Sequence, residues 1–256
     1  MLTDSAIERY SRQLVLPEWS GAVQERLAGA TAMVIGAGAL GSPAATYLAC
    51  AGVGRLGIVD GDDVDVSNLQ RQPLHFTPDI GGQKAETAAQ KLGLLNTEIT
   101  VEPYPVTLDE QNAEAIVTGA DVVLDCSDSF ETRYAVNEAC CAARVPLVEA
   151  GVLGFSGMVM AIRPGETACY RCAFPTPPPA GSVPTCREAG ILGAVAGVLG
   201  SLQALEALKL LSGVGEAPGD VIVQFDGLTL TQTLVHTKRR DGCTACARVP
   251  AASHSL

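Results

Sequence analysis

The stretch TAMVIGAGALGSPAATYLAC, residues 31–50, decides the fold of this 256-residue chain. Its first five residues form a short apolar run, which predicts a buried strand, and residues 42–50 read as a helix. Between them, Gly36, Gly38 and Gly41 form the pattern G-x-G-x-x-G. At a strand-to-helix turn, this pattern lets phosphates approach the backbone beside a helix N-terminus. The alternative is that the glycines only allow strand and helix to pack closely.

The next hundred residues continue the alternation of strands and helices. Strands are predicted at 55–60, 99–103, 120–125 and 146–150, and helices at 83–95 and 130–143. This order is typical of a Rossmann-like, doubly wound, mainly parallel α/β sheet, in which ligands bind beyond the carboxyl ends of the strands. Residues 1–150 are therefore predicted to be the nucleotide-binding half of a single domain that spans 1–256.

The pattern changes after residue 151. Residues 151–246 are predicted to hold an exposed Pro-rich crossing loop at 174–185, a buried helix within 189–205 and late strands at 221–226 and 229–238. These strands predict a C-terminal strand-rich layer, and residues 247–256 form a tail. The apolar stretch 189–205 is shorter than the ~20 residues of a membrane span, so no membrane contact is expected.

The charge balance limits the range of partners. The formal net charge of −11 argues against nucleic acid, which would need a basic face. Residues 1–10 are polar and of mixed charge, unlike a secretory signal peptide, so a cytoplasmic protein is expected.

Charged side chains follow the second and fourth predicted strands. Asp60 is placed to accept hydrogen bonds from ribose hydroxyls. Arg71 and Lys84 are cations that would stabilise the charge on departing pyrophosphate, whereas a dehydrogenase with the same glycine pattern has no need of them. Asp128 could hold Mg²⁺, cap the helix at 130–143, or do both. These residues favour adenylation with ATP over hydride transfer.

Four of the nine cysteines form two C-x-x-C pairs, Cys169 with Cys172 and Cys243 with Cys246. A redox C-x-x-C would be expected once, at a helix start, whereas four thiolates in two pairs are the ligand set of a closed tetrahedral zinc site. The pairs therefore predict a structural Zn²⁺ that ties the C-terminal tail to the crossing loop. Small buried thiols are predicted for the cysteines within helices or a strand: Cys50, Cys126, Cys140 and Cys141.

Cys186 and the histidines are less informative. Cys186 lies beside Arg187 and near a predicted helix N-terminus, which could favour a thiolate, and a structural loop cysteine fits equally well. His75 and His236 have no sequence partners that suggest catalysis.

Together these motifs resemble the E1-like superfamily, typified by molybdopterin-synthase adenylyltransferases (MoeB) and ThiF proteins. The resemblance runs from ERYSRQL at 8–14 to Cys246 and includes SNLQRQ at 67–72, GGQK at 81–84 and DCSD at 125–128. It implies an ATP site with Asp128 at the Mg²⁺. The predicted nucleotide-binding set is Gly36, Gly38, Ala39, Gly41, Asp60, Asp62, Ser67, Asn68, Leu69, Gln70, Arg71, Gln72, Lys84, Asp128 and Ser129. Many family members have Gly in place of Ala39 and Asn in place of Ser129.

The resemblance also implies partners and a reaction. The family forms homodimers in which a residue matching Arg12 reaches the neighbour's phosphates, although a solvated surface role also fits Arg12. In some relatives the residue matching Cys186 links covalently to the carrier. The expected activity is adenylation of the C-terminal Gly-Gly carboxylate of a ubiquitin-like sulfur carrier of the MoaD or ThiS type.

Sulfur is expected from a separate donor, because only ten residues follow Cys246. The pathway, molybdenum cofactor, thiamine or another, stays open. The alternatives are an E1-like tRNA-modifying dehydratase and a catalytically idle dimer scaffold.

Overall fold

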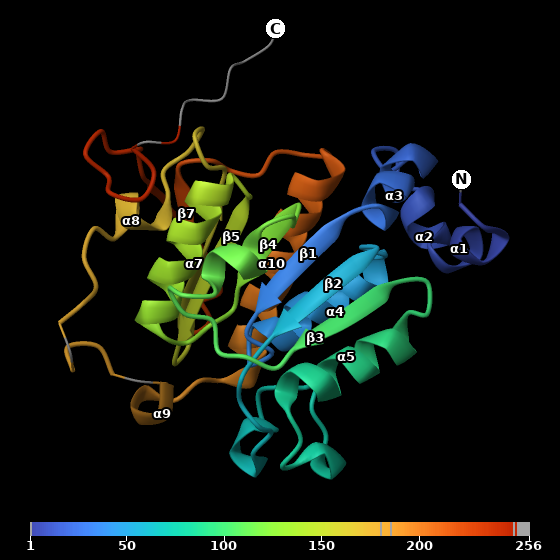
Figure 1. Cartoon of the computed structure of the whole chain (residues 1–256), viewed down its shortest axis with the longest axis horizontal. Helices are drawn as coiled ribbons and strands as arrows, with labels where there is room; N and C mark the ends of the chain where they lie inside the picture. Colours follow the sequence, from blue (N-terminus) through green and yellow to red (C-terminus); the bar gives the residue numbers. More distant parts are fainter. Residues whose placement is uncertain (1, 180, 185, 248, 250–256) are drawn as a thin grey trace, which may run out of the picture.

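The computed structural model describes residues 2–179, 181–184, 186–247 and 249, without the side chains at 186 and 187. Eight strands form one sheet in the order β3-β2-β1-β4-β5-β6-β7-β8 (Figure 1). The strands are β1 (Thr31–Ile35), β2 (Arg55–Val59), β3 (Thr100–Tyr104), β4 (Val122–Asp125), β5 (Leu147–Leu153), β6 (Ser156–Ile162), β7 (Val221–Asp226) and β8 (Thr231–His236).

Helices cover both faces of the sheet. They are α1 (Asp4–Arg9), α2 (Ser11–Leu14), α3 (Gly21–Ala28), α4 (Gly41–Ala51), α5 (Lys84–Leu95), α6 (Ala113–Val117), α7 (Phe130–Ala143), α8 (Tyr170–Ala173), α9 (Cys186–Ala189) and α10 (Gly193–Ser212). Two 3₁₀ turns, η1 (Val66–Asn68) and η2 (Thr77–Asp79), lie between β2 and α5.

The parallel half of the sheet confirms the doubly wound prediction. Strands β3, β2, β1, β4 and β5 pair in parallel. Alternate residues of β1 enter different cores: Val34 packs with α4, α5 and α10, whereas Met33 packs with α6 and α7. Each face therefore buries its own apolar layer, and the turns after β1, β2 and β4 meet at one edge.

The late strands differ from the prediction, because they extend the same sheet and form no layer of their own. β6, β7 and β8 join antiparallel to β5. The sequence did not predict β6, which folds back from β5 through a tight turn where Gly154 has a φ of 59°. The glycines after residue 151 are thus part of a hairpin, in which Gly157 lies so close to β5 that a Cβ would be 2.3 Å from the Gly151 carbonyl oxygen.

Helix α10 is buried as predicted but is longer, with 20 residues ending at the left-handed Gly213. Its length and apolar composition alone would fit a membrane span, although half of its most apolar window is buried inside the protein. Its small residues allow close packing, since a Cβ at Gly200 would lie 2.4 Å from the Leu40 carbonyl oxygen at the start of α4.

The prediction for the lone cysteines is partly wrong. Cys126, Cys140 and Cys141 are buried thiols, but Cys50 is exposed on the outer side of α4. The described part of the predicted crossing loop is mostly exposed.

Candidate active site

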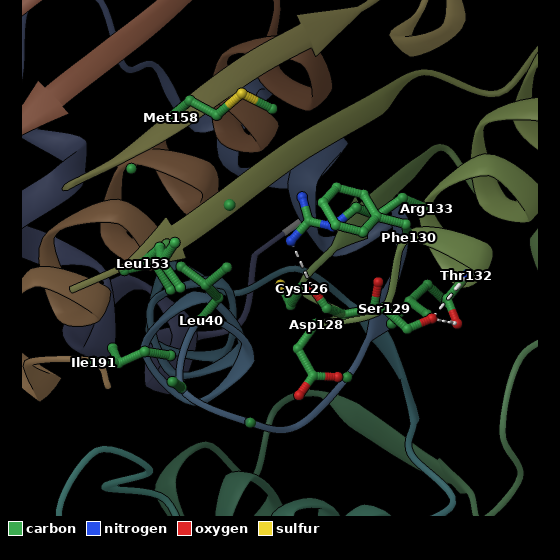
Figure 2. Close-up of a pocket in the computed structure, with 18 of the residues that line it drawn as sticks. Leu40, Cys126, Asp128, Ser129, Phe130, Thr132, Arg133, Leu153, Met158 and Ile191 are labelled. Carbon is green, nitrogen blue, oxygen red and sulfur yellow. Dashed lines mark hydrogen bonds between the residues drawn. The ribbon is translucent and has the colours of Figure 1, made fainter. Parts of the chain in front are cut away.

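The carboxyl ends of β1, β2 and β4 border a cavity of about 1320 Å³. Among the residues predicted to bind the nucleotide, ten line this cavity: Gly36, Gly38, Ala39, Asp60, Asp62, Arg71, Gln72, Lys84, Asp128 and Ser129. Residues of β6 to β8 form another part of the lining, so the cavity extends from the glycine turn toward the antiparallel half. Figure 2 shows part of it around the loop that carries Asp128.

The glycine turn offers free backbone donors to this cavity. The amides of residues 38–41 donate to no acceptor within the part of the chain that the structure describes, and α4 has no side-chain cap. Unpaired amides at a helix N-terminus form an anion site. Gly38 faces the cavity, whereas Gly41 serves packing, because a Cβ there would lie 1.8 Å from the Gly36 carbonyl oxygen. The packing interpretation of the glycine pattern is thus confirmed at Gly41, whereas phosphate binding by the rest of the turn stays a prediction.

Asp60 follows β2, and its carboxylate stabilises the glycine turn by a hydrogen bond. Its Oδ2 accepts a hydrogen bond from the Ala37 amide at 2.8 Å, and its Oδ1 accepts one from the Asp62 amide at 2.9 Å. Burial raises the pKa of this carboxyl, and the charge of Lys84 opposes the shift. Each oxygen keeps a lone pair that could accept from a ribose hydroxyl.

The two predicted phosphate cations are both at the cavity and both held by protein oxygens. Lys84 is 6% exposed, and its Nζ lies 2.8 Å from Asp62 Oδ2. Arg71 donates from Nη1 to the Ser67 carbonyl oxygen at 2.8 Å. A bound triphosphate would compete with these oxygens for the cations.

The rest of the SNLQRQ segment does not line the cavity. Asn68 Oδ1 accepts from the Asp65 amide while the Asp65 carboxylate accepts from the Ser67 amide, so these groups stabilise the turn η1. Leu69 and Gln70 follow this turn, and a Cβ at Gly193 of α10 would lie 2.7 Å from the Gln70 carbonyl oxygen. The segment therefore positions Arg71 and Gln72 by local bonds and by packing against α10.

The loop after β4 presents Asp128. Its side chain is exposed and points to the opposite side of the loop from the Arg133 guanidinium (Figure 2). The alternative of a helix cap is wrong for Asp128, because Ser129 caps α7: its Oγ accepts from the Thr132 amide at 3.0 Å. Asp128 is thus left free of that local bond, and its carboxylate is available to a cation.

A buried ionic cluster beneath this loop was not foreseen from the sequence. Arg133, 9% exposed, donates to Glu149 Oε1 at 2.5 Å and to the carbonyl oxygens of Ala150 and Ser127 at 2.9 Å each. The Asp125 carboxylate accepts from the Ser127 amide at 2.9 Å. Burial and the Asp125 carboxylate raise the pKa of Glu149. The available signal was a charged residue within each of two buried strands, Asp125 in β4 and Glu149 in β5, because a buried charge needs a partner.

The four paired cysteines converge as predicted. Their sulfurs all lie within 4.8 Å of one another and all four residues are buried. Cys169 Sγ is 3.7 Å from Cys172 Sγ and 3.6 Å from Cys243 Sγ, and Cys172 Sγ is 3.4 Å from Cys246 Sγ. A tetrahedral zinc with bonds of about 2.3 Å separates its sulfurs by about 3.8 Å, so the cluster could hold this ion.

The remaining predicted site residues are Arg12 and Cys186. Arg12 is exposed on α2, at the end of the sheet away from the carboxyl ends of the parallel strands (Figure 1), and it does not line the cavity of its own chain. The side chain of Cys186 lies outside the described residues, so its predicted reactivity stays a prediction.

The fold and cavity define a Rossmann-like α/β protein with a nucleotide-type turn, and solved structures share this architecture. The crystal structure of E. coli MccB with ATP matches it with a TM-score of 0.83 and 23% identity, over 93% of this chain and 74% of that chain. Residues 10–245 match the ThiF family, so the chain belongs to the ThiF family.

Curated relatives agree with this membership. The chain is 48% identical to the adenylyltransferase and sulfurtransferase MOCS3 of Sus scrofa over 97% of its length, but it spans about half (55%) of that relative. It is 44% identical to the sulfur carrier protein adenylyltransferase of Thermus thermophilus, over 97% of this chain and 93% of the relative. It is 41% identical to the SAMP-activating enzyme E1 of Haloferax volcanii, over 96% and 90%.

Proposed function

We propose that this chain is an ATP-dependent adenylyltransferase that activates the C-terminal Gly-Gly carboxylate of a ubiquitin-like sulfur carrier. The main support for the proposal is that one cavity is lined by unpaired backbone amides and by three charged side chains, Arg71, Lys84 and Asp128. The names of the MOCS3 and sulfur carrier adenylyltransferase relatives support it. No observation favours the tRNA-modifying dehydratase or the idle scaffold, and the intact cations and Asp128 speak against the scaffold.

The reaction needs charge stabilisation more than proton transfer. A carboxylate oxygen of the carrier attacks the α-phosphorus of ATP, and the bond from this phosphorus to the bridging β-phosphate oxygen breaks with its electrons leaving on pyrophosphate. The carboxylate is already ionised, so no general base is required. Amides 38–40 bind phosphate oxygens, and Arg71 and Lys84 stabilise the charge that develops on the leaving group. Asp60 orients the ribose.

Mg²⁺ fits the carboxylate of Asp128, which is exposed to the cavity and free of the helix-capping bond. Hard oxygen ligands of this kind, together with substrate phosphates, are the usual magnesium site. When bound, the ion would neutralise phosphate charge. Ser129, next along the chain, caps α7 and so fixes the direction of the Asp128 backbone.

The proposed partners are a second copy of this chain, the carrier and a separate sulfur donor. A groove with a mainly apolar lining runs between α4, α5 and α10, and it includes the exposed side chains Tyr47, Leu94 and Leu205. Such a patch supports burial against another protein surface. A second copy would also give a role to Arg12, which does not line the cavity of its own chain and would reach the neighbour's phosphates.

The test of the reaction is ATP–pyrophosphate exchange with candidate Gly-Gly carriers. The variants Arg71→Ala, Lys84→Ala and Asp128→Ala should each lose about 10²-fold to 10³-fold in exchange rate, because each removes charge stabilisation of the transition state. Arg55→Ala, an exposed arginine outside the cavity, is the matched control and should retain wild-type exchange. Exchange that survives in all three site variants would remove the proposal.

We also propose that the cysteine cluster binds a structural Zn²⁺ in a cytoplasmic protein, where thiols stay reduced. Metal analysis of the purified chain should give one zinc per subunit. The double variant Cys243→Ser with Cys246→Ser should lose this zinc and unfold at lower urea, because two of four ligands are gone. Cys50→Ser, at an exposed free thiol, should keep it. Zinc that persists in the double variant would contradict the site.

A further inference from the structure

His75 is buried beneath the glycine turn and has no role in the reaction described so far. Its side chain belongs to a residue only 3% exposed, and it does not line the cavity. The ring contacts two segments that line the cavity, the glycine turn and α5. Nε2 lies 3.0 Å from the Ala37 carbonyl oxygen, and Nδ1 lies 3.0 Å from Thr87 Oγ1. His75 therefore joins the glycine turn to α5, the helix that begins with Lys84.

The direction of one of these bonds is fixed by chemistry. A carbonyl oxygen only accepts, so Nε2 carries the hydrogen and donates it to Ala37. Burial lowers the pKa of the ring, and the nearby ammonium groups of Lys91 and Lys84 act in the same direction. The ring is thus neutral at neutral pH, and Nδ1 accepts from the Thr87 hydroxyl. That hydroxyl also lies 3.2 Å from the Lys84 carbonyl oxygen, in the first turn of α5.

The bond to Ala37 orients the neighbouring amide. A trans peptide is planar, so the carbonyl of Ala37 and the N–H of Gly38 point in opposite directions. The Ala37 carbonyl accepts from His75 at 3.0 Å and, less closely, from the buried Ser42 hydroxyl at 3.3 Å, so it is directed into the protein. The Gly38 N–H is therefore directed the other way, on the side of the cavity that Gly38 lines. The preceding peptide is held as well, because the Ala37 N–H donates to Asp60 Oδ2 at 2.8 Å.

We propose that His75 is a positioning residue for ATP: through Nε2 it holds the Ala37–Gly38 peptide so that the Gly38 amide faces the phosphates. Through Nδ1 it keeps this turn in register with the start of α5 and hence with Lys84. The inference rests on the proposed function, because ATP is the ligand that the amide would meet. A histidine that only fills the core would support folding but would leave ATP affinity unchanged in the folded protein.

Two variants with the same side-chain amide but different side-chain lengths distinguish a positioning role from a purely structural role of His75. In His75→Gln the side-chain amide can place an N–H near the position of Nε2, whereas in His75→Asn it reaches only to the position of Nδ1. Calorimetric titration of the full chain with ATP and Mg²⁺, well below the unfolding temperature of each variant, should give Kd values within about threefold of wild type for Gln. For Asn we expect Kd to rise about tenfold, the effect of losing one buried hydrogen bond.

Kinetics and a control complete the test. In pyrophosphate exchange, His75→Asn should raise KM for ATP about as much as Kd while leaving KM for the carrier unchanged. His236→Gln, at an exposed histidine of β8, should bind ATP like wild type. Equal ATP affinity in His75→Asn and wild type would overturn the positioning role alone. A wild-type chain that binds no ATP would instead overturn the proposed function.

Discussion

Two turns that border the cavity each have one residue whose backbone N–H and C=O are both fixed by side-chain hydrogen bonds. After β1, the Ala37 amide donates to the Asp60 carboxylate and the Ala37 carbonyl accepts from His75. After β4, the Ser127 amide donates to the Asp125 carboxylate and the Ser127 carbonyl accepts from Arg133. In both turns a carboxylate fixes the N–H of one residue and a longer side chain fixes its C=O.

The two turns differ in the charge of the longer side chain. His75 is neutral and makes two bonds to uncharged groups, whereas Arg133 is a buried cation that donates to the Glu149 carboxyl group and is stabilised by the charge of the Asp125 carboxylate. A neutral ring can be removed at the cost of its hydrogen bonds, but removal of a buried cation leaves carboxyl groups without compensation. The turn that presents amides to phosphates is thus held by neutral contacts, and the turn that presents Asp128 is held by an ionic cluster.

Arg133→Met breaks the charged turn and should have the largest effect. We expect a loss of about 3–5 kcal/mol in the free energy of unfolding, because Glu149 and Asp125 stay buried without their cation. Urea denaturation at pH 7 measures it. Adding Glu149→Leu should regain part of the loss, because it removes one unpaired carboxyl.

The matched control is Arg55→Met, which removes an exposed arginine 3.8 Å from the partly exposed Glu102 and should cost less than about 1 kcal/mol. If Arg133→Met also lowered the free energy of unfolding by less than about 1 kcal/mol, the ionic cluster would not stabilise the turn after β4 as we expect.

A methyl group at Gly36 should disturb both turns at once. Gly36 has a φ of 95°, and a Cβ there would lie 2.9 Å from the Cys126 carbonyl oxygen in the turn after β4. Gly36→Ala should therefore lose roughly 1–3 kcal/mol in the free energy of unfolding. At Gly38 a Cβ would meet only Gln72 Nε2 at 3.6 Å, so Gly38→Ala should change stability by less than about 0.5 kcal/mol. Equal losses in thermal or urea unfolding would argue that the turns are not in contact.

The sequence was sufficient for features that depend on neighbours along the chain. The apolar run of β1, the glycine turn and α7 were predicted closely, since each depends on a local pattern of apolar residues or glycines. The paired cysteines were equally readable, because their spacing itself encodes a ligand set.

Features that depend on pairing across the sheet were not readable. The partners Arg133 and Glu149 are joined only because α7 and β5 meet in the fold, and β6 becomes a strand because β5 and β7 flank it. The sequence shows no partner for His75, because its contact Ala37 lies 38 residues away along the chain. One error was local: Ser129, one residue after Asp128, takes the cap, and a sequence pattern does not resolve a shift of one residue.

The two turns should also respond to pH with opposite signs. Burial, assisted by the Asp125 carboxylate, raises the pKa of Glu149, so the folded state keeps a proton that the unfolded chain releases above about pH 4.5. Its contribution to stability is complete below that pH and is lost as pH rises toward the folded pKa. Burial lowers the pKa of His75, so below about pH 6.5 the unfolded chain takes up a proton that the folded ring resists. The contribution of the His75 ring to stability is therefore lost as pH falls toward its pKa in the folded state.

Variants without these groups should therefore change the pH dependence of the free energy of unfolding in different pH ranges, one as pH rises and the other as pH falls. Compared with wild type, Glu149→Gln should lose less stability as pH rises from 5, and His75→Gln should lose less as pH falls below 6.5. Each difference in slope is bounded by about 1.4 kcal/mol per pH unit, the limit for one proton. Urea unfolding from pH 5 to 8 measures both. A His75→Gln profile parallel to wild type below pH 6.5 would mean that the buried ring titrates as it does in the unfolded chain, and the neutral character of the first turn would be lost.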